Sequence, residues 1–300
     1  MRLVAAAPGK VNLCLLVGSR RGDGRHEVVT LLESVSLADE VSLTTRDGAG
    51  SDEVRSPGVE GPNIVSRALE GLRMRGWNGP PVTVEIAKQI PIAAGMGGGS
   101  ADAAATIRLT QHLHPLADDE LQELAAELGS DVPSQLRPGL ALGTGAGHQV
   151  DRLQALAPHA FVIVPLPHQL STAAVYAEAD RLGLARAPAE LERKRTQLMS
   201  ALSAGAQLPD ELIVNDLEPA ALSLCRPIAD VIDAVRDAGA DHAMVSGSGP
   251  TVFGLFWGTD SSARAETAAL TISRRLPGAK SAVVVDADFS HPRVSAQSRN

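Results

Sequence analysis

The segment Pro91–Ser100 constrains the fold of this chain most, because it holds four glycines between a strand pattern and a helix pattern. Residues 82–86 alternate as a half-buried strand does, and residues 101–113 have a helical composition. A helix that begins at such a loop presents unpaired N–H groups and about half a positive charge, which stabilise a bound phosphate. Glycines also let the backbone approach phosphate oxygens closely. The segment therefore predicts a phosphate loop, and a flexible glycine connector is the alternative interpretation.

The N-terminal half is expected to be rich in strands and to contain helices. Residues 11–17 and 28–41 are strand-like, and the turn signal Asp23-Gly24 between them predicts an antiparallel meander. A polar loop over residues 47–62 leads into residues 63–75, where apolar side chains recur at helical spacing. These patterns predict strands and helices in one N-terminal layer.

The C-terminal half is expected to form a layer of its own. Its strand patterns, at residues 160–164, 243–257 and 282–285, are separated by helical segments. We therefore expect an α+β fold with an N-terminal domain at residues 1–155, a C-terminal domain at residues 156–286 and a polar, frayed tail at residues 287–300.

Charge and composition exclude several classes of protein. A net charge of -8 argues against nucleic-acid binding, and 2% aromatic residues leave no platform for base stacking. No apolar run reaches transmembrane length, and the apolar start is too short for a secretory signal, which predicts a cytoplasmic protein. Cys14 and Cys225 lie in apolar stretches and are expected to be buried thiols. His112 and His114 would not share a helix face, so no metal site built from protein ligands is predicted.

A second glycine cluster, Ser246–Pro250, separates two apolar segments. Taken alone, a hairpin turn explains it equally well. Together with Pro8–Leu13 and Pro91–Ala105, however, it completes three ordered motifs that resemble those of the GHMP kinase superfamily. The resemblance implies a two-domain α+β kinase, with ATP over the glycine loop and the acceptor in the cleft between the domains.

Four further segments resemble one family within that superfamily, the kinases of a cytidine diphosphate-linked methylerythritol. They are Asp23–His26, Gly129–Pro133, Ser171-Thr172 with Tyr176, and Asn215–Glu218. The resemblance spans nearly the whole chain and implies phosphoryl transfer from ATP, bound with Mg²⁺, to the tertiary 2-hydroxyl of that small molecule. This reaction belongs to the non-mevalonate isoprenoid pathway. No nucleic acid, membrane or obligatory protein partner is expected.

Lys10 and Asp131 are the catalytic pair that the resemblance implies. Phosphoryl transfer requires neutralisation of the γ-phosphate charge, an in-line hydroxyl and a carboxylate that accepts its proton. A lysine near Asp131 would keep that carboxylate ionised and stabilise charge on the transferred group. Taken alone, Asp131 before Pro133 equally fits a helix N-cap, and Lys10 a surface lysine.

The resemblance also assigns residues to the two ligands. The ATP-binding residues are Asn63, Lys88, Pro91, Ala94, Gly95, Met96, Gly97, Gly98, Gly99 and Ser100. The substrate-binding residues are Asn12, His26, Gly247, Ser248 and Gly249. Asn63 alone would cap the helix expected at residues 63–75. Asp102 is expected in the first turn of a different helix, at residues 101–113, and is interpreted as complementing the dipole of that helix.

His26 is placed by the resemblance at the edge of the cytosine. Without the resemblance it would be an exposed turn residue. Arg25 departs from the family pattern, because some members carry an aromatic residue there that stacks on the base, although a guanidinium stacks as well.

Two other functions stay open. One is a GHMP kinase for another acceptor, such as homoserine, mevalonate or a sugar, which His26 and Gly129–Pro133 disfavour. The other is a nucleotide-binding protein without catalysis, which the presence of both Lys10 and Asp131 disfavours.

Overall fold

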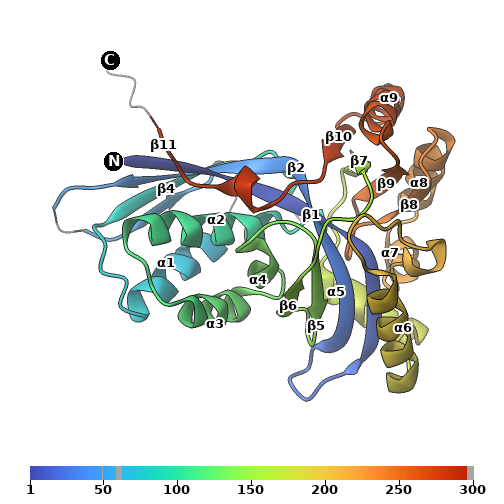
Figure 1. Ribbon diagram of the computed structural model, residues 1–300, viewed down its shortest axis with the longest axis horizontal. Coiled ribbons are helices and arrows are strands. Elements are labelled where there is room, and N and C mark those ends of the chain that lie inside the picture. Colours follow the sequence, from blue (N-terminus) through green and yellow to red (C-terminus); the bar gives the residue numbers. More distant parts are fainter. Residues whose placement is uncertain (49, 59–62, 93, 296–300) are drawn as a thin grey trace.

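The computed structural model describes residues 1–48, 50–58, 63–92 and 94–295. Within them the chain forms one sheet of seven strands and one of four, with helices packed on both (Figure 1). The α+β prediction is confirmed. No helix in these described ranges is long and apolar enough to span a membrane.

The larger sheet is built on two long antiparallel strands that meet at the predicted turn, where Gly24 has a φ of 83°. Strand order is β11-β1-β2-β4-β3, and β5 also pairs with β2 and β6. The strands are β1 (Arg2–Arg20), β2 (His26–Thr45), β3 (Glu53–Arg55), β4 (Val82–Ala87), β5 (Ala141–Thr144), β6 (Gln149–Arg152) and β11 (Arg293–Val294). Strand β3 lies inside the stretch that was expected to be a loop.

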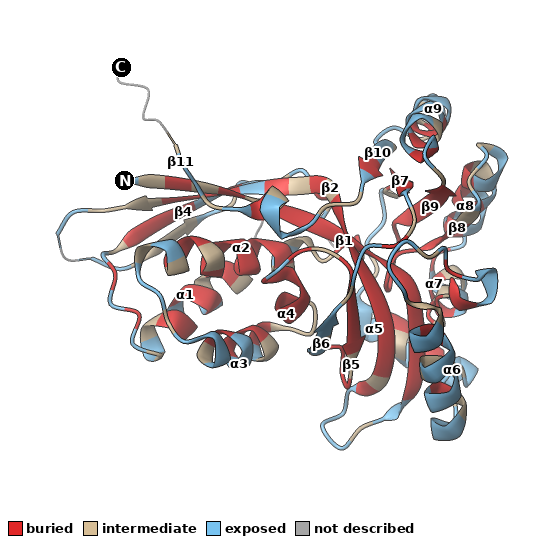
Figure 2. Ribbon diagram, viewed as in Figure 1, coloured by how far each residue is buried: buried red, intermediate tan, exposed pale blue. Residues whose placement is uncertain are grey.

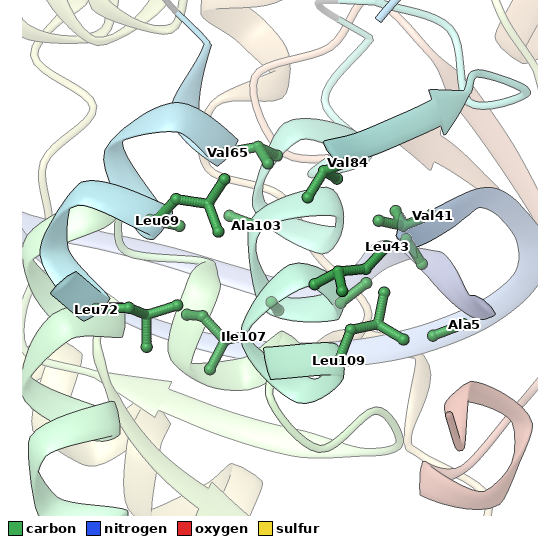
Figure 3. Packing of buried hydrophobic residues seen from close by; sticks show 14 of the residues in the cluster. Ala5, Val41, Leu43, Val65, Leu69, Leu72, Val84, Ala103, Ile107 and Leu109 are labelled. Atoms are coloured by element: carbon green, nitrogen blue, oxygen red, sulfur yellow. The ribbon is translucent and has the colours of Figure 1, made fainter. Parts of the chain in front are cut away.

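Helices cover one face of the larger sheet. They are α1 (Ile64–Met74), α2 (Gly98–Leu113), α3 (Asp118–Leu128) and α4 (Val132–Gln135). Small buried residues such as Ala103 let α2 lie close to the sheet, and Figure 3 shows Leu69 and Leu72 of α1 on its other side. This close packing fixes the direction of α2 and therefore the position of its first turn.

The smaller sheet has the order β10-β7-β9-β8, and all its pairings are antiparallel. Its strands are β7 (His159–Val164), β8 (His242–Val245), β9 (Val252–Trp257) and β10 (Lys280–Val283). The accompanying helices are α5 (Thr172–Leu182), α6 (Pro188–Ala201), η1 (Asp210–Leu212), α7 (Glu218–Leu224), α8 (Pro227–Asp237) and α9 (Ser261–Ser273). The three strand patterns expected in this half are all present.

The two halves share a hydrophobic core. Val11 and Leu31 of the long strands belong to the same buried cluster as Phe161 and Phe253 of the smaller sheet, and Figure 2 shows burial along most of β1 and β2. Apolar contact therefore joins the segments on either side of residue 155, while the exact domain boundary stays a prediction.

The C-terminal segment corrects one expectation. Residues 287–294 are not frayed, because η2 (Ala287–Ser290) and β11 return to the first sheet, where Leu3 pairs with Val294. Ser290 is fully buried. Backbone pairing with β1 supplies the order that the polar sequence of this segment does not reveal.

Both cysteines are buried thiols, as expected. Burial raises the pKa of Cys14 to about 12 and also raises that of Cys225. Neither is activated as a nucleophile, because the thiolate is the reactive form.

Glu33 is a buried carboxyl group where the two sheets meet. Its Oε2 lies 3.6 Å from Nε2 of His159, and burial raises the pKa of Glu33 while His159 partly offsets that rise. The folded protein thus holds the Glu33 proton more tightly than the unfolded chain does. Its contribution to stability is full below the unfolded pKa and is lost as pH rises through the folded pKa.

We therefore expect the Glu33→Gln variant to gain stability relative to the parent as pH rises above the ordinary glutamate value of 4.5. The gain should grow as pH rises, until Glu33 of the folded parent is fully ionised. Thermal unfolding across pH 4 to 8 measures it, with exposed Glu266→Gln as the control. Parallel plots of stability against pH for the Glu33 variant and the parent would contradict a raised pKa of Glu33 in the folded protein.

Candidate active site

A cleft of about 520 Å³ opens where β1, the start of α2 and the β8–β9 turn meet. The sequence-predicted residues that line it are Lys10, Asn12, Asn63, Lys88, Pro91, Ala94, Gly95, Met96, Gly97, Gly98, Gly99, Ser100, Asp131, Gly247 and Ser248. Two predicted residues, His26 and Gly249, do not line it. The cleft thus gathers residues from both halves of the chain.

The glycine loop leads directly into α2. The helix begins at Gly98, three residues earlier than predicted, and its N-cap Gly97 has a φ of 67°. Gly98, Gly99 and Ser100 therefore form the first helical turn at the wall of the cleft. Their amide groups are the unpaired donors of a helix N-terminus. The loop residue Ala93 lies outside the described residues.

The two glycine clusters are in direct contact at Gly95. A Cβ on Gly95 would lie 2.2 Å from the carbonyl oxygen of Ser246, so no larger residue fits. The Gly95 carbonyl accepts hydrogen bonds from Lys10 Nζ at 2.7 Å and from Ser246 Oγ at 3.2 Å. The Ser246 cluster is therefore both the hairpin turn between β8 and β9 and a wall of the cleft.

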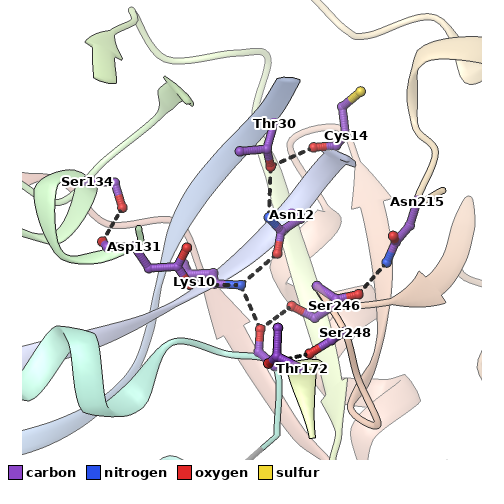
Figure 4. A network of polar contacts seen from close by, with 12 residues as sticks. Lys10, Asn12, Cys14, Thr30, Asp131, Ser134, Thr172, Asn215, Ser246 and Ser248 are labelled. Carbon is purple, nitrogen blue, oxygen red and sulfur yellow. Dashed lines mark hydrogen bonds and ion pairs between the residues drawn. The ribbon is translucent and has the colours of Figure 1, made fainter. Parts of the chain in front are cut away.

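Lys10 lies at the centre of this polar network and is only 4% exposed (Figure 4). Its Nζ donates to Asn12 Oδ1 at 2.7 Å as well as to the Gly95 carbonyl. Asn12 lies two residues along the same strand and so on the same face. Its Nδ2 donates to Thr30 Oγ1 at 2.8 Å, which leaves Oδ1 directed at the lysine. The surface-lysine alternative for Lys10 is wrong.

Asp131 faces Lys10 across the cleft. Its Oδ2 lies 3.6 Å from Lys10 Nζ, and its side chain is 33% exposed. Asp131 occupies the N-cap position of α4, yet its side chain makes no capping hydrogen bond. The N-cap interpretation of Asp131 is therefore confirmed for its position in the chain. It is wrong for the side chain, which does not cap the helix and remains open to a ligand.

Lys88 is held between two carboxylates. Its Nζ donates to Asp39 Oδ2 at 2.5 Å and to Asp102 Oδ2 at 2.8 Å. Burial opposes the charge on Lys88, but Asp102 and Asp39 outweigh it and raise the lysine's pKa. Burial raises the pKa of Asp102 to about 7, with a smaller contribution from the neighbouring Asp39 carboxylate, and Lys88 only partly offsets the rise. Asp102 lies in the second turn of α2, one turn later than expected, because the glycines themselves are helical.

Asp39 is a residue that sequence reasoning missed. It is 1% exposed, and its Oδ1 accepts hydrogen bonds from the backbone of Gln89 and Ile90. An acidic residue within an apolar strand was the one available signal, because buried carboxylates require partners. Asp39 thereby fixes the entry to the glycine loop.

Asn63 has the capping role that its sequence position suggests. Its Oδ1 accepts from the Val65 amide at 2.9 Å at the start of α1. Because Asn63 also lines the cleft, its assignment to ATP stays a prediction.

His26 is buried, so the exposed-turn alternative is wrong. Its Nε2 lies 2.7 Å from Asp180 Oδ1, and its ring stacks on Tyr176 with centroids 5.0 Å apart. Tyr176 lines the cleft, whereas Arg25 is exposed and pairs with Asp23. The aromatic surface at this end of the cleft is therefore Tyr176, with His26 in support.

Comparison with known proteins defines the family. A model described as the GHMP kinases N terminal domain matches residues 63–139, and one described as GHMP kinases C terminal matches residues 189–277. A protein of Mycolicibacterium gilvum named 4-diphosphocytidyl-2-C-methyl-D-erythritol kinase is 43% identical over 258 residues, which cover 81% of this chain and 79% of that protein.

Solved structures agree with this family. A 4-(cytidine 5'-diphospho)-2C-methyl-D-erythritol kinase matches with a TM-score of 0.70 and 31% identity, over 94% of this chain and 98% of the other. A homoserine kinase from Cytophaga hutchinsonii matches with a TM-score of 0.66 over 98% of this chain and 96% of the other, but at 20% identity it shows the fold alone. The chain therefore belongs to the GHMP kinases, which transfer a phosphoryl group from ATP, and within them to the 4-diphosphocytidyl-2-C-methyl-D-erythritol kinase family.

Proposed function

We propose that this protein transfers the γ-phosphoryl group of ATP to the 2-hydroxyl of 4-diphosphocytidyl-2-C-methyl-D-erythritol. The observation that carries the proposal is the Lys10–Asp131 pair, which lies in the same cleft as the first turn of α2. The acceptor is taken from the names of the relatives.

In the proposed complex, ATP phosphates bind at the first turn of α2. Gly98, Gly99 and Ser100 supply backbone N–H donors, and the helix dipole favours the negative charge. Lys10 supplies a fixed positive charge beside this turn, as a Cβ on Gly97 would lie 3.2 Å from Lys10 Cε. Preorganised donors of this kind stabilise the charge of phosphoryl transfer without reorganising.

Magnesium is proposed to bind together with ATP. The hydroxyl of Ser100 and the carboxyl group of Asp102 both line the cleft, and the buried Oδ1 of Asp102 has no hydrogen-bond partner among the described residues. Such oxygens are the ligands that Mg²⁺ takes, usually with several waters. When bound, the ion would neutralise charge on the phosphates.

Asp131 is proposed to accept the proton of the acceptor hydroxyl. The hydroxyl oxygen bonds to the γ-phosphorus, the bond from that phosphorus to the bridging oxygen breaks, and ADP leaves. The proton passes to the Asp131 carboxylate, while Lys10 stabilises charge on the attacking and transferred oxygens. Positioning in the cleft contributes alongside proton removal.

The cytidine is proposed to lie against Tyr176. This ring lines the cleft and is stacked on His26, which Asp180 holds by its Nε2. Aromatic faces stack on bases with a gain of about 1–3 kcal/mol. A direct contact between His26 and cytosine stays a prediction, as do a cytoplasmic location and the absence of an obligatory protein partner.

A panel of acceptors tests the proposal. We expect ADP release with 4-diphosphocytidyl-2-C-methyl-D-erythritol, and none above background with homoserine, mevalonate, galactose or the same alcohol phosphate without cytidine. Turnover that does not depend on the cytidine diphosphate group would favour another acceptor. ATP binding without turnover on any acceptor would favour the non-catalytic alternative.

A further inference from the structure

The segment Asn215–Glu218 resembles the family, yet none of the roles above uses its polar side chains. Asn215 is 8% exposed, and its Nδ2 donates to the carbonyl oxygens of Val245 and Gly247, both at 2.8 Å. Its Oδ1 accepts from the Leu217 amide at 2.9 Å. These contacts fix the orientation of the amide, because a flip would turn Oδ1 toward two carbonyl oxygens.

The same segment is bonded to the strand that carries the catalytic lysine. The Leu15 amide of β1 donates to Val214 at 2.7 Å, and the Asp216 amide donates back to Leu15 at 2.9 Å. Asn215 therefore connects β1 to the β8–β9 turn, two elements that approach each other from different sheets.

Glu218 holds the same turn at its beginning. Its Oε2 accepts from the Val245 amide at 2.9 Å. Asn215 and Glu218 thus bind both the N–H and the C=O of Val245, the last residue of β8.

The turn held in this way lies against the catalytic groups. A Cβ on Gly247 would lie 3.1 Å from Lys10 Nζ and 3.2 Å from Asn12 Oδ1, so a small shift of the turn would disturb the lysine. Ser248 is also fixed, since its Oγ lies 3.1 Å from the Thr172 hydroxyl. Gly247 and Ser248 both line the cleft.

We propose that Asn215 is a positioning residue for phosphoryl transfer, which sets the Gly247–Ser248 backbone against Lys10 and the acceptor. The inference rests on the proposed function. Its consequence is expected to be selective, because Gly247 lies against Lys10 and Asn12, the residues assigned to catalysis and to the acceptor, whereas the proposed phosphate donors are amides of α2. Loss of the two Nδ2 hydrogen bonds should therefore change turnover and acceptor binding more than ATP binding.

The test compares Asn215→Asp and Asn215→Leu with the parent, using ATP and 4-diphosphocytidyl-2-C-methyl-D-erythritol. Asn215→Asp keeps the shape and the acceptor for Leu217 but places an oxygen against the two carbonyls. We expect kcat/KM for the acceptor to fall by about 10²-fold in both variants, as a displacement of about 1 Å can cause. The KM for ATP should change by less than about threefold, a small fraction of that effect.

Asp216→Asn is the matched control. The Asp216 carboxylate binds Arg186 and the Val17 amide, and among the described residues it makes no hydrogen bond to the turn. We expect this variant to lose thermal stability but to retain the kinetic constants of the parent per folded molecule. If Asn215→Leu does not fold, Asn215→Ser, which retains one donor, provides the second comparison.

Two results would overturn the inference. Kinetic constants of the Asn215 variants that match those of Asp216→Asn, per folded molecule, would show a purely structural role while leaving the proposed function intact. No turnover by the parent with this acceptor would overturn the proposed function and this inference together.

Discussion

Asp131→Asn is expected to reduce turnover by about 10²–10⁴-fold, the range for loss of a general base, while ATP affinity stays within a few-fold of the parent. The substitution keeps the size of the side chain but removes its capacity to accept the acceptor's proton. It also removes the negative charge that lies 3.6 Å from Lys10. Steady-state kinetics and binding of a non-hydrolysable ATP analogue measure the two effects separately.

The fold should tolerate this change. The Asp131 side chain is 33% exposed and makes no capping hydrogen bond, so its replacement leaves no buried group unpaired in α4. Asp233→Asn, at an exposed site on α8, is the control for the loss of one carboxylate. Near-parental turnover by the Asp131 variant would show that proton removal by this group is not required.

Gly95→Ala is expected to eliminate most turnover and to destabilise the protein. Its φ of 77° is in the left-handed region, and the added Cβ would lie 2.2 Å from the Ser246 carbonyl oxygen. Strained backbone of this kind costs about 1–3 kcal/mol, and relief of the clash must separate the two glycine clusters. That separation would break the hydrogen bonds of Lys10 and Ser246 to the Gly95 carbonyl.

Gly76→Ala measures the cost of a side chain at positive φ in the absence of a steric clash. Gly76 has a similar φ of 87°, but its added Cβ would meet nothing within 4 Å. We expect this control to lose some stability and to keep full turnover per folded molecule. Equal losses of activity in the two variants would contradict the idea that contact between the glycine clusters assembles the site.

Local patterns predicted much of the fold, because strands and helices with one buried face have recognisable periodicities. The helix at residues 63–75 is present as α1, with Asn63 as its cap. Elements that depend on distant partners were missed. Strand β3 has only three residues, and β11 exists because its backbone pairs with the N-terminal end of β1.

The start of α2 was placed three residues too late for a related reason. Glycine is a poor helix former, so Gly98 and Gly99 predict a loop. In the folded chain, packing of α2 against the sheet outweighs this preference. This difference matters for the proposed function, because it places the helix N-terminus at the proposed phosphate loop itself.

The site was less visible than the fold. Lys10 and Asp131 are far apart in sequence, and each has an ordinary explanation alone, so only the motif order suggested that they belong together. Their 3.6 Å approach depends on tertiary structure that brings β1 and the start of α4 to the same cleft. Asp39 and Asn215 act through buried hydrogen bonds to backbone groups, which no spacing pattern in the sequence records.

Transfer of label from γ-labelled ATP follows the phosphoryl group itself. In a single turnover with 4-diphosphocytidyl-2-C-methyl-D-erythritol, we expect the label to appear on the 2-hydroxyl of the acceptor for the parent and to be nearly absent for Asp131→Asn. Label recovered only as inorganic phosphate, or equal transfer by both proteins, would contradict a cleft in which Lys10 and Asp131 direct the γ-phosphoryl group to this alcohol.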